Sequence, residues 1–315
     1  MATFNEKLQA KWDEGKFVCV GLDSELGKIP KSARAVIEED LSDMDRFDAR
    51  VLYTMVNFNK RIVDATQHLV CAYKLNAAFY EAEGNIGLEV LRETILYINQ
   101  IAPHVPVILD AKRADISNTN VGYAEMAFNY CKADAITVHP YLGRETLQPF
   151  LDQKDKGVIV LCRTSNKGGG EFQDCKIQLP TLYPGGKHEE FLQFERRIGY
   201  QLSETCVPLY QYVAFRVAEH WNTSGNCALV VGATYPEELA QVRRIVGDMP
   251  ILIPGIGAQG GDVEATVKAG MDSRGQGMII NSSRGIIFAS DGPDFAEAAR
   301  RETLKLHNLI NQYRN

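Results

Sequence analysis

Three charged residues, spaced D-x-K-x-x-D, follow an apolar run in the stretch PVILDAKRADI. The run Pro106–Leu109 is long enough for a buried strand, and Asp110, Lys112 and Asp115 come directly after it. On an extended chain the side chains of Asp110 and Lys112 point to the same side. A lysine held by carboxylates can stabilise negative charge and transfer a proton. The pattern therefore indicates either a site at the carboxyl end of a parallel strand or a solvated strand end with an ion pair.

Apolar runs along the chain predict the strands that must position these residues. They are continuous rather than alternating, as expected for strands that are buried on both faces. Helical spacing separates them, which predicts a (β/α)8 TIM barrel, an α/β fold, with a doubly wound sheet as the alternative. No linker or change of composition indicates a second domain within residues 1–315. The eight predicted strands are Phe17–Leu22, Leu69–Phe79, Pro106–Leu109, Asp134–His139, Gly157–Thr164, Ala228–Gly232, Ile251–Gly257 and Gly277–Asn281.

One segment breaks the alternation of strands and helices. Asn166–Lys187, after the fifth predicted strand, is glycine-rich and irregular, and a loop of this length in a compact domain is usually disordered or a functional lid. Helical spacing resumes over His188–His220, with a possible break at Pro208. The other predicted helices are 3–15, Asp45–His68, Gly84–Ala102, Ser117–Tyr130, Gly143–Phe150, Pro236–Val246, Asp262–Ala269 and Asp294–Tyr313.

Composition excludes several classes of protein. The net charge of −6 over 315 residues argues against a nucleic-acid binder, which would carry a basic excess. The seven cysteines form no C-x-x-C pair, which favours reduced thiols in a cytoplasmic protein over a disulfide framework. We expect no signal peptide, because the first residues are charged, and no membrane partner, because no apolar stretch is long enough to span a bilayer.

The barrel prediction brings the polar residues at the strand ends together. In a parallel barrel the carboxyl ends of all strands converge on one face. Charged side chains end the first three predicted strands, which are neighbours, and solvent exposure alone explains such a set poorly. A structural network of salt bridges stays open as the alternative. The residues at or just after strand ends are Asp23, Lys74, Asp110, Lys112, Ser165, Gln259 and Arg284.

The stretch GIGAQGG, Gly255–Gly261, formally matches the dinucleotide fingerprint G-x-G-x-x-G. That fingerprint belongs on the first strand of its fold, whereas this copy follows the seventh of eight predicted strands. We interpret it as a phosphate cradle, since glycines let backbone N–H groups approach an anion and Arg284 at the next strand end could bind phosphate bidentately. A tight turn without a ligand is the alternative.

Six motifs in this order resemble orotidine 5′-phosphate decarboxylase, and the likeness spans nearly the whole chain. They are VGLDS (20–24), YKLNAAFYE (73–81), LDAKRADI (109–116), RTSNKG (163–168), PGIGAQGG (254–261) and NSSRG (281–285). The length and the GAQGG form are similar to the longer, bacterial-type branch of that family. The resemblance implies a carbon–carbon lyase that converts orotidine 5′-phosphate to UMP in pyrimidine biosynthesis.

The resemblance also implies a catalytic set and a homodimer. Lys74, Asp110 and Lys112 match the family's charged network, with Lys112 as the residue that stabilises and protonates C6 of the pyrimidine. Asp115 matches the acid that completes the network from the neighbouring subunit, and Thr119 matches a residue that reaches the partner's ligand. No metal and no organic cofactor is expected.

Substrate contacts carried over from the family lie at the other strand ends. Asp23 matches a ribose contact with Asn76 nearby, and Ser165 matches the serine that binds the pyrimidine amide. Phosphate contacts are implied for Gln259 and Arg284, with Gly257 and Gly260 shaping the loop. The resemblance assigns no role to His139, which we expect to be structural, and no ligand contacts within 166–187.

Two other functions stay open at this point. Sugar-phosphate decarboxylases and hexulose-phosphate synthases share D-x-K-x-x-D but use Mg²⁺, with an acid at the end of the second strand, where this chain has Lys74. A non-catalytic protein that binds nucleotide phosphates would need Arg284 and the glycines, but not two lysines and two acids beside them.

Overall fold

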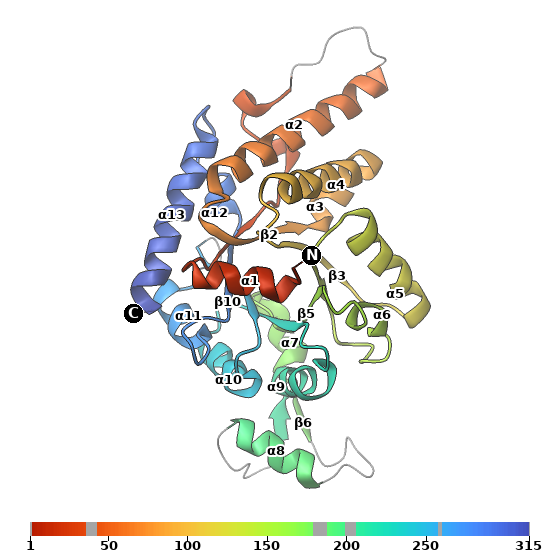
Figure 1. Ribbon diagram of the computed structural model, residues 1–315, viewed down its shortest axis with the longest axis vertical. Helices are drawn as coiled ribbons and strands as arrows, with labels where there is room; N and C mark the ends of the chain where they lie inside the picture. The colour runs from red at the N-terminus through yellow and green to blue at the C-terminus, as the bar shows by residue number, and fades with distance from the viewer. Residues whose placement is uncertain (1, 36–42, 179–187, 199–205, 258–259, 315) are drawn as a thin grey trace.

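Eight parallel strands form a closed barrel in the part of the chain that the structure describes, and helices surround it (Figure 1). The structure is a computed structural model that describes residues 2–35, 43–178, 188–198, 206–257 and 260–314. Each strand pairs with the next along the barrel, and the last closes on the first. This confirms the (β/α)8 prediction and excludes the doubly wound sheet. The strands are β1 Val18–Gly21, β2 Val70–Asn76, β3 Val107–Arg113, β4 Ala135–Val138, β5 Gly157–Arg163, β8 Cys227–Val231, β9 Ile251–Pro254 and β10 Met278–Ser282.

Helices connect the strands and cover the outside of the barrel (Figure 1). Two of them, α5 and α9, continue into π-helical turns at Glu125–Tyr130 and Val217–Trp221. No helix in the described ranges is long and apolar enough to cross a membrane. The helices are α1 Phe4–Asp13, α2 Asp43–Thr66, α3 Ala77–Glu81, α4 Gly84–Ile101, α5 Ser117–Ala124, α6 Gln148–Leu151, α7 Gly170–Gln173, α8 His188–Ile198, α9 Leu209–Arg216, α10 Pro236–Val246, α11 Val263–Gly270, α12 Arg284–Ile287 and α13 Phe295–Arg314.

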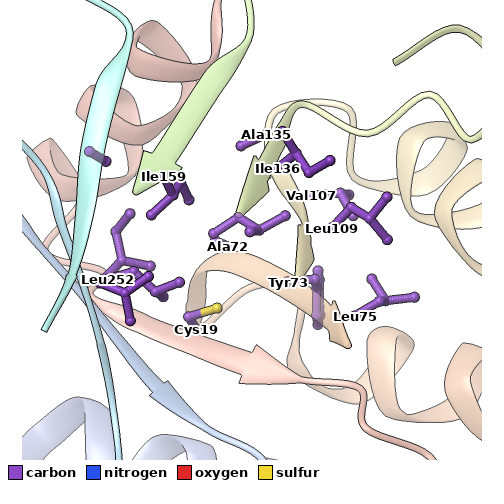
Figure 2. Packing of buried hydrophobic residues seen from close by; sticks show 14 of the residues in the cluster. Cys19, Ala72, Tyr73, Leu75, Val107, Leu109, Ala135, Ile136, Ile159 and Leu252 are labelled. Carbon is purple, nitrogen blue, oxygen red and sulfur yellow. The ribbon is translucent and has the colours of Figure 1, made fainter. Parts of the chain in front are cut away.

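The barrel interior is packed with apolar side chains from all around the sheet. Cys19, Ala72, Ile159 and Leu252, from four different strands, lie close together between the strands (Figure 2). Burial on both faces of the sheet explains why the strands read as continuous apolar runs in the sequence.

Helix α1 covers the amino end of the barrel. Its residues Phe4, Leu8 and Trp12 are buried, and Trp12 Nε1 donates a hydrogen bond of 2.9 Å to the carbonyl oxygen of Met278, the first residue of β10. With this end covered, the carboxyl end is the face left for a ligand.

Several strand boundaries differ from the prediction, including the end of β9 at Pro254 rather than Gly257, and two of the others bear directly on the charged residues. β2 ends at Asn76 rather than Phe79, because the side chain of Asn76 accepts a hydrogen bond from Ala78 N at 3.2 Å and caps α3. β3 continues to Arg113 rather than ending at Leu109, so Asp110 and Lys112 belong to the strand itself. Pairing of β3 with β4 is irregular between Leu109 and Arg113, which an apolar pattern does not reveal.

The segment predicted to be irregular, Asn166–Lys187, is partly ordered. It contains a 3₁₀ turn, α7 and the short strand β6 Lys176–Gln178, which pairs antiparallel with β7 Cys206–Pro208. The prediction of one continuous irregular loop is therefore wrong for residues 167–178, and residues 179–187 lie outside the described residues. The predicted break at Pro208 is confirmed, since α9 begins at Leu209, but a strand rather than a helix precedes it.

Candidate active site

A chain of alternating charges lies at the carboxyl ends of β1, β2 and β3. Asp110 is shared by two lysines, with Oδ2 3.1 Å from Lys74 Nζ and Oδ1 2.7 Å from Lys112 Nζ. Lys74 Nζ also lies 3.1 Å from Oδ1 of Asp23, just beyond β1. Lys74 and Asp110 are buried, whereas the side chain of Lys112 is 47% exposed. The open end of the network is therefore an ammonium group.

Thr137 on β4 supports the centre of this network, and sequence reasoning missed it. Its Oγ donates to Asp110 Oδ1 at 2.8 Å and accepts from the backbone N–H of Lys112 at 3.0 Å. Lys112 has a φ of 49°, which is unfavourable for a residue with a side chain and persists only where its surroundings hold it. A hydroxyl within the apolar run DAITVH was the only signal of this role in the sequence.

The two buried charges hold each other ionised. Burial alone would lower the pKa of Lys74, but Asp23 and Asp110 outweigh it and raise that pKa above its ordinary value. Burial alone would raise the pKa of Asp110, but Lys74 and Lys112 outweigh it and hold that pKa well below its ordinary value. Lys74 and Asp110 are therefore both charged at neutral pH, as a preorganised electrostatic site requires.

A cavity of about 280 Å³ opens beside the network. Its lining combines the charged side chains of the network, apolar residues from β5, β8 and β9, and Arg284, the first residue of α12. Ser165, predicted to bind the pyrimidine amide, lines the same cavity with its neighbours. The residues that line it are Asp23, Lys74, Asn76, Asp110, Lys112, Leu161, Thr164, Ser165, Asn166, Val230, Leu252, Pro254, Gly255, Ile256, Asn281, Ser282, Ser283 and Arg284.

The glycine-rich stretch after β9 forms a tight turn next to this cavity. Gly255, Gly257 and Gly260 have φ values of 108°, 76° and 85°, a region that side chains rarely adopt. Gly260 N donates to Gly257 O at 2.8 Å, which closes the turn. Gly255 lines the cavity, while Gly257 and Gly260 build the turn that follows it. The predicted phosphate contact Gln259 lies outside the described residues.

Asn281 on β10 is a second polar residue that sequence reasoning did not assign. It is buried, lines the cavity, and its Oδ1 has no hydrogen-bond partner among the described residues. Gly21 on β1 makes room for it, because a Cβ there would lie 3.2 Å from Asn281 Oδ1 and 1.8 Å from Ser283 Oγ. A buried acceptor without a partner is costly, so Asn281 is a candidate ligand contact.

Asp115, Thr119 and His139 lie outside the charged network in the part of the chain that the structure describes. The carboxylate of Asp115 accepts a hydrogen bond from Ile116 N at 2.7 Å, and neither Asp115 nor Thr119 lines the cavity of its own chain. Asn76 lines the cavity and its backbone N–H donates to Asp23 Oδ1 at 3.3 Å, while its side-chain oxygen caps α3. His139 lies instead at a second, largely apolar cavity of about 800 Å³, where its Nδ1 accepts from Tyr141 N at 3.3 Å.

The fold and the charged cavity at its carboxyl end define the class of protein, a (β/α)8-barrel enzyme. More narrowly, the chain belongs to the orotidine 5′-phosphate decarboxylase / HUMPS family, whose model matches residues 17–183. The chain is 46% identical to an orotidine 5′-phosphate decarboxylase of Ralstonia pickettii, over 99% of each chain.

Solved structures lead to the same family. The structure of Leishmania donovani OMP decarboxylase matches with a TM-score of 0.70 and 34% identity, over 97% of this chain and 99% of that one. Leishmania donovani UMP synthase matches with a TM-score of 0.76 and 36% identity, and this chain spans 57% of its length.

Because Asp110 and Lys74 form a buried ion pair, we expect the free energy of unfolding to depend on pH. Asp110→Asn leaves Lys74 buried with one carboxylate, and we expect a loss on the order of 3 kcal/mol in the free energy of unfolding at pH 7. Because the pKa of Asp110 is lowered by folding, its stabilisation is present above the unfolded pKa of about 3.9 and is lost as pH falls below it. The difference in the free energy of unfolding between wild type and Asp110→Asn should therefore become smaller from pH 5 to pH 3, as measured by urea denaturation. A difference that stays constant over this range would contradict the assigned network.

Proposed function

We propose that this chain catalyses the decarboxylation of orotidine 5′-phosphate to UMP and CO₂ in pyrimidine biosynthesis, with no metal or organic cofactor. One observation carries the proposal: Asp110 lies between Lys74 and Lys112 in a cavity that also holds Arg284, in a chain of this family. The relatives named orotidine 5′-phosphate decarboxylase cover the chain almost completely, which supports the same activity.

The lining of the cavity gives each part of the nucleotide a partner. Arg284 and the turn at Gly255 would hold the phosphate, since a guanidinium group and backbone N–H groups both bind anions. Asp23 would accept from a ribose hydroxyl, and Ser165 would bind the amide edge of the pyrimidine. This placement leaves C6 of the ring next to Lys112.

The chemistry then follows from the position of the ammonium group. When the bond between C6 and the carboxylate breaks, CO₂ leaves and the electron pair stays on C6, where the ring delocalises it poorly. The positive charge of Lys112 stabilises this pair, and Lys112 Nζ then transfers a proton to C6, which gives UMP and a neutral amine. The ion pair with Asp110 keeps Lys112 aimed until that step, and a carboxylate beside the substrate carboxylate adds electrostatic stress.

The phosphate lies far from the reacting carbon but can still contribute to the rate. Its binding energy can drive closure of the segment after β5, whose residues Ser165 and Asn166 already line the cavity. Arg163 ties this segment to the barrel, because its Nε lies 2.8 Å from Asp174 Oδ1 and its Nη2 donates to Asp174 Oδ2 at 3.0 Å.

The working unit in this proposal is a homodimer in which Asp115 and Thr119 reach the partner's site. Support comes from apolar side chains exposed near Asp115: Ile116 and Val121 are 57% and 58% exposed, and Tyr141 is 86% exposed. The segment that holds Tyr141 is tied to α5, since Asn120 Nδ2 donates to Thr146 O at 2.7 Å. Exposed apolar side chains on and around α5 favour contact with a second copy.

We also propose that the chain acts as one domain in the cytoplasm. The seven cysteines, which all fall within the described ranges, are free thiols, and five of them are buried. Free buried thiols are typical of reducing compartments.

The proposed chemistry is tested first at Lys112. Lys112→Ala should lower kcat for orotidine 5′-phosphate by roughly 10³-fold or more, because it removes both the charge at C6 and the proton donor. The fall in absorbance as the substrate is consumed measures this change in kcat. Lys132→Ala is the matched control, since Lys132 also has a positive φ, 61°, but is exposed and does not line the cavity. Near-normal turnover by a folded Lys112→Ala protein would refute the mechanism.

A second prediction tests the phosphate end of the cavity. Arg284→Ala should weaken UMP binding by roughly 10–100-fold, since a charged hydrogen bond contributes about 1.5–3 kcal/mol, and should leave uridine binding unchanged. Calorimetric titration with both ligands measures this, with Arg274→Ala as a control because Arg274 pairs with Asp272 and does not line the cavity. An equal loss of binding affinity for UMP and for uridine would argue against a contact between Arg284 and the phosphate.

A third prediction separates this reaction from the Mg²⁺-dependent chemistry of the same superfamily. Those enzymes need an acid at the end of the second strand, and here Lys74 Nζ fills that position 3.1 Å from Asp110, where an ammonium group would repel a cation. Decarboxylation should therefore proceed at an unchanged rate after dialysis against EDTA. Loss of activity that Mg²⁺ restores would favour the alternative reaction.

A further inference from the structure

The most extensively bonded polar side chain near Asp115 is that of Asn120, one turn into α5. Asn120 is fully buried, and its Oδ1 accepts from the backbone N–H of Asp115 at 2.9 Å. Its Nδ2 donates to the backbone carbonyl of Asp115 at 2.7 Å and to that of Thr146 at 2.7 Å. One amide group thus binds both sides of Asp115 and joins it to the segment after β4.

These bonds fix the backbone on which the Asp115 carboxylate is carried. The N–H and C=O of Asp115 belong to the two peptide units that flank its Cα, so holding both sets the direction in which Cβ leaves the chain. The carboxylate itself has a local bond, since Ile116 N donates to Asp115 Oδ1 at 2.7 Å, whereas the N-cap residue of α5, Ile116, makes no side-chain capping bond in the described structure. The direction of the Asp115 side chain therefore depends on Asn120.

We propose that Asn120 is a positioning residue that aims Asp115 into the active site of the partner subunit. The inference rests on the proposed function, in which Asp115 acts across a dimer interface. Asn120 contacts no substrate in this scheme. It acts through Asp115, so its loss damages the partner's site and leaves the site of its own chain intact, provided that the partner supplies a well-held Asp115.

Because the loss of Asn120 should damage only the partner's site, a hybrid dimer can distinguish a positioning role from a merely structural one. Asn120→Leu, which keeps the volume and removes all three bonds, should lower kcat about 100-fold through misplacement of a catalytic group. It is then co-expressed with Lys112→Ala under a different affinity tag, and only the hybrid dimer is isolated. One site of the hybrid has Lys112 together with an Asp115 held by an intact Asn120, so about half of the wild-type activity should return, one competent site of two.

The control hybrid pairs Asp115→Asn with Lys112→Ala. It should also recover about half of the wild-type activity, again because one of the two sites is intact. No recovery in this control would refute action across the interface, and with it the dimer part of the proposed function. Recovery in the control without recovery in the Asn120→Leu hybrid would overturn the role of Asn120 alone.

A matched variant separates positioning from stability. Asn226 is also buried, and its Nδ2 donates to three backbone carbonyls, those of Leu151, Gln153 and Lys156, but it precedes β8 at the opposite end of the barrel. Asn226→Leu should lower the melting temperature without a comparable loss of kcat in the folded fraction. If Asn120→Leu does not fold, Asn120→Ala takes its place in the same hybrid, because water can replace the lost bonds there. Equal kcat losses for the Asn226 and Asn120 variants would mean that Asn120 is merely structural.

Discussion

A single buried carboxylate, Asp110, shared by two ammonium groups, is the constraint on which the rest of the site depends. Removing charges from water is costly unless each one meets an opposite charge at close range. The order Asp23, Lys74, Asp110, Lys112 meets this condition, because each inner charge lies between two opposite ones at 2.7–3.1 Å. The only member with a large exposed fraction is Lys112, at the end of the chain. Burial of the two inner charges, those of Lys74 and Asp110, thus leaves an ammonium group at the exposed end of the network.

The backbone is arranged around the same interaction. Lys112 adopts a positive φ within an irregular part of β3, and Thr137 from the neighbouring strand bonds both its N–H and the carboxylate of Asp110. A conformation of this kind costs on the order of 1–3 kcal/mol and persists only when its surroundings fix it. The ion pair of 2.7 Å with Asp110 and the bond to Thr137 are those surroundings. The strain thus lies at the residue for which we propose the chemistry.

The sequence was most informative where local pattern and global fold agree. Strands buried on both faces must be apolar throughout, so the eight runs predicted the barrel, and a parallel barrel must bring its strand ends to one face. What sequence could not supply depends on partners distant along the chain. Thr137 contacts a carboxylate 27 residues away, and β6 and β7 are three-residue strands that exist only because they pair with each other. Asn76 reads as strand in an apolar pattern, but the boundary is decided by its side chain, which caps α3. Asn281 reads as the end of a strand, and only the lack of a hydrogen-bond partner for its Oδ1 among the described residues indicates a ligand contact.

The charges within one chain also bear on why a second subunit would contribute an acid. Asp23 and Asp110 balance Lys74 and Lys112, so the network as described is neutral. In the proposed dimer, Asp115 of the partner subunit adds a negative charge to a site that must bind a substrate carboxylate. That charge repels the bound carboxylate. The repulsion falls as CO₂ leaves and the electron pair moves to C6 beside Lys112. The added charge therefore lowers the barrier to decarboxylation rather than only the affinity for the substrate. The effect requires that the added carboxylate cannot swing away from the substrate. A backbone held on both sides of Asp115, as Asn120 holds it, meets that requirement, whereas a freely rotating loop would relieve the stress before the bond breaks.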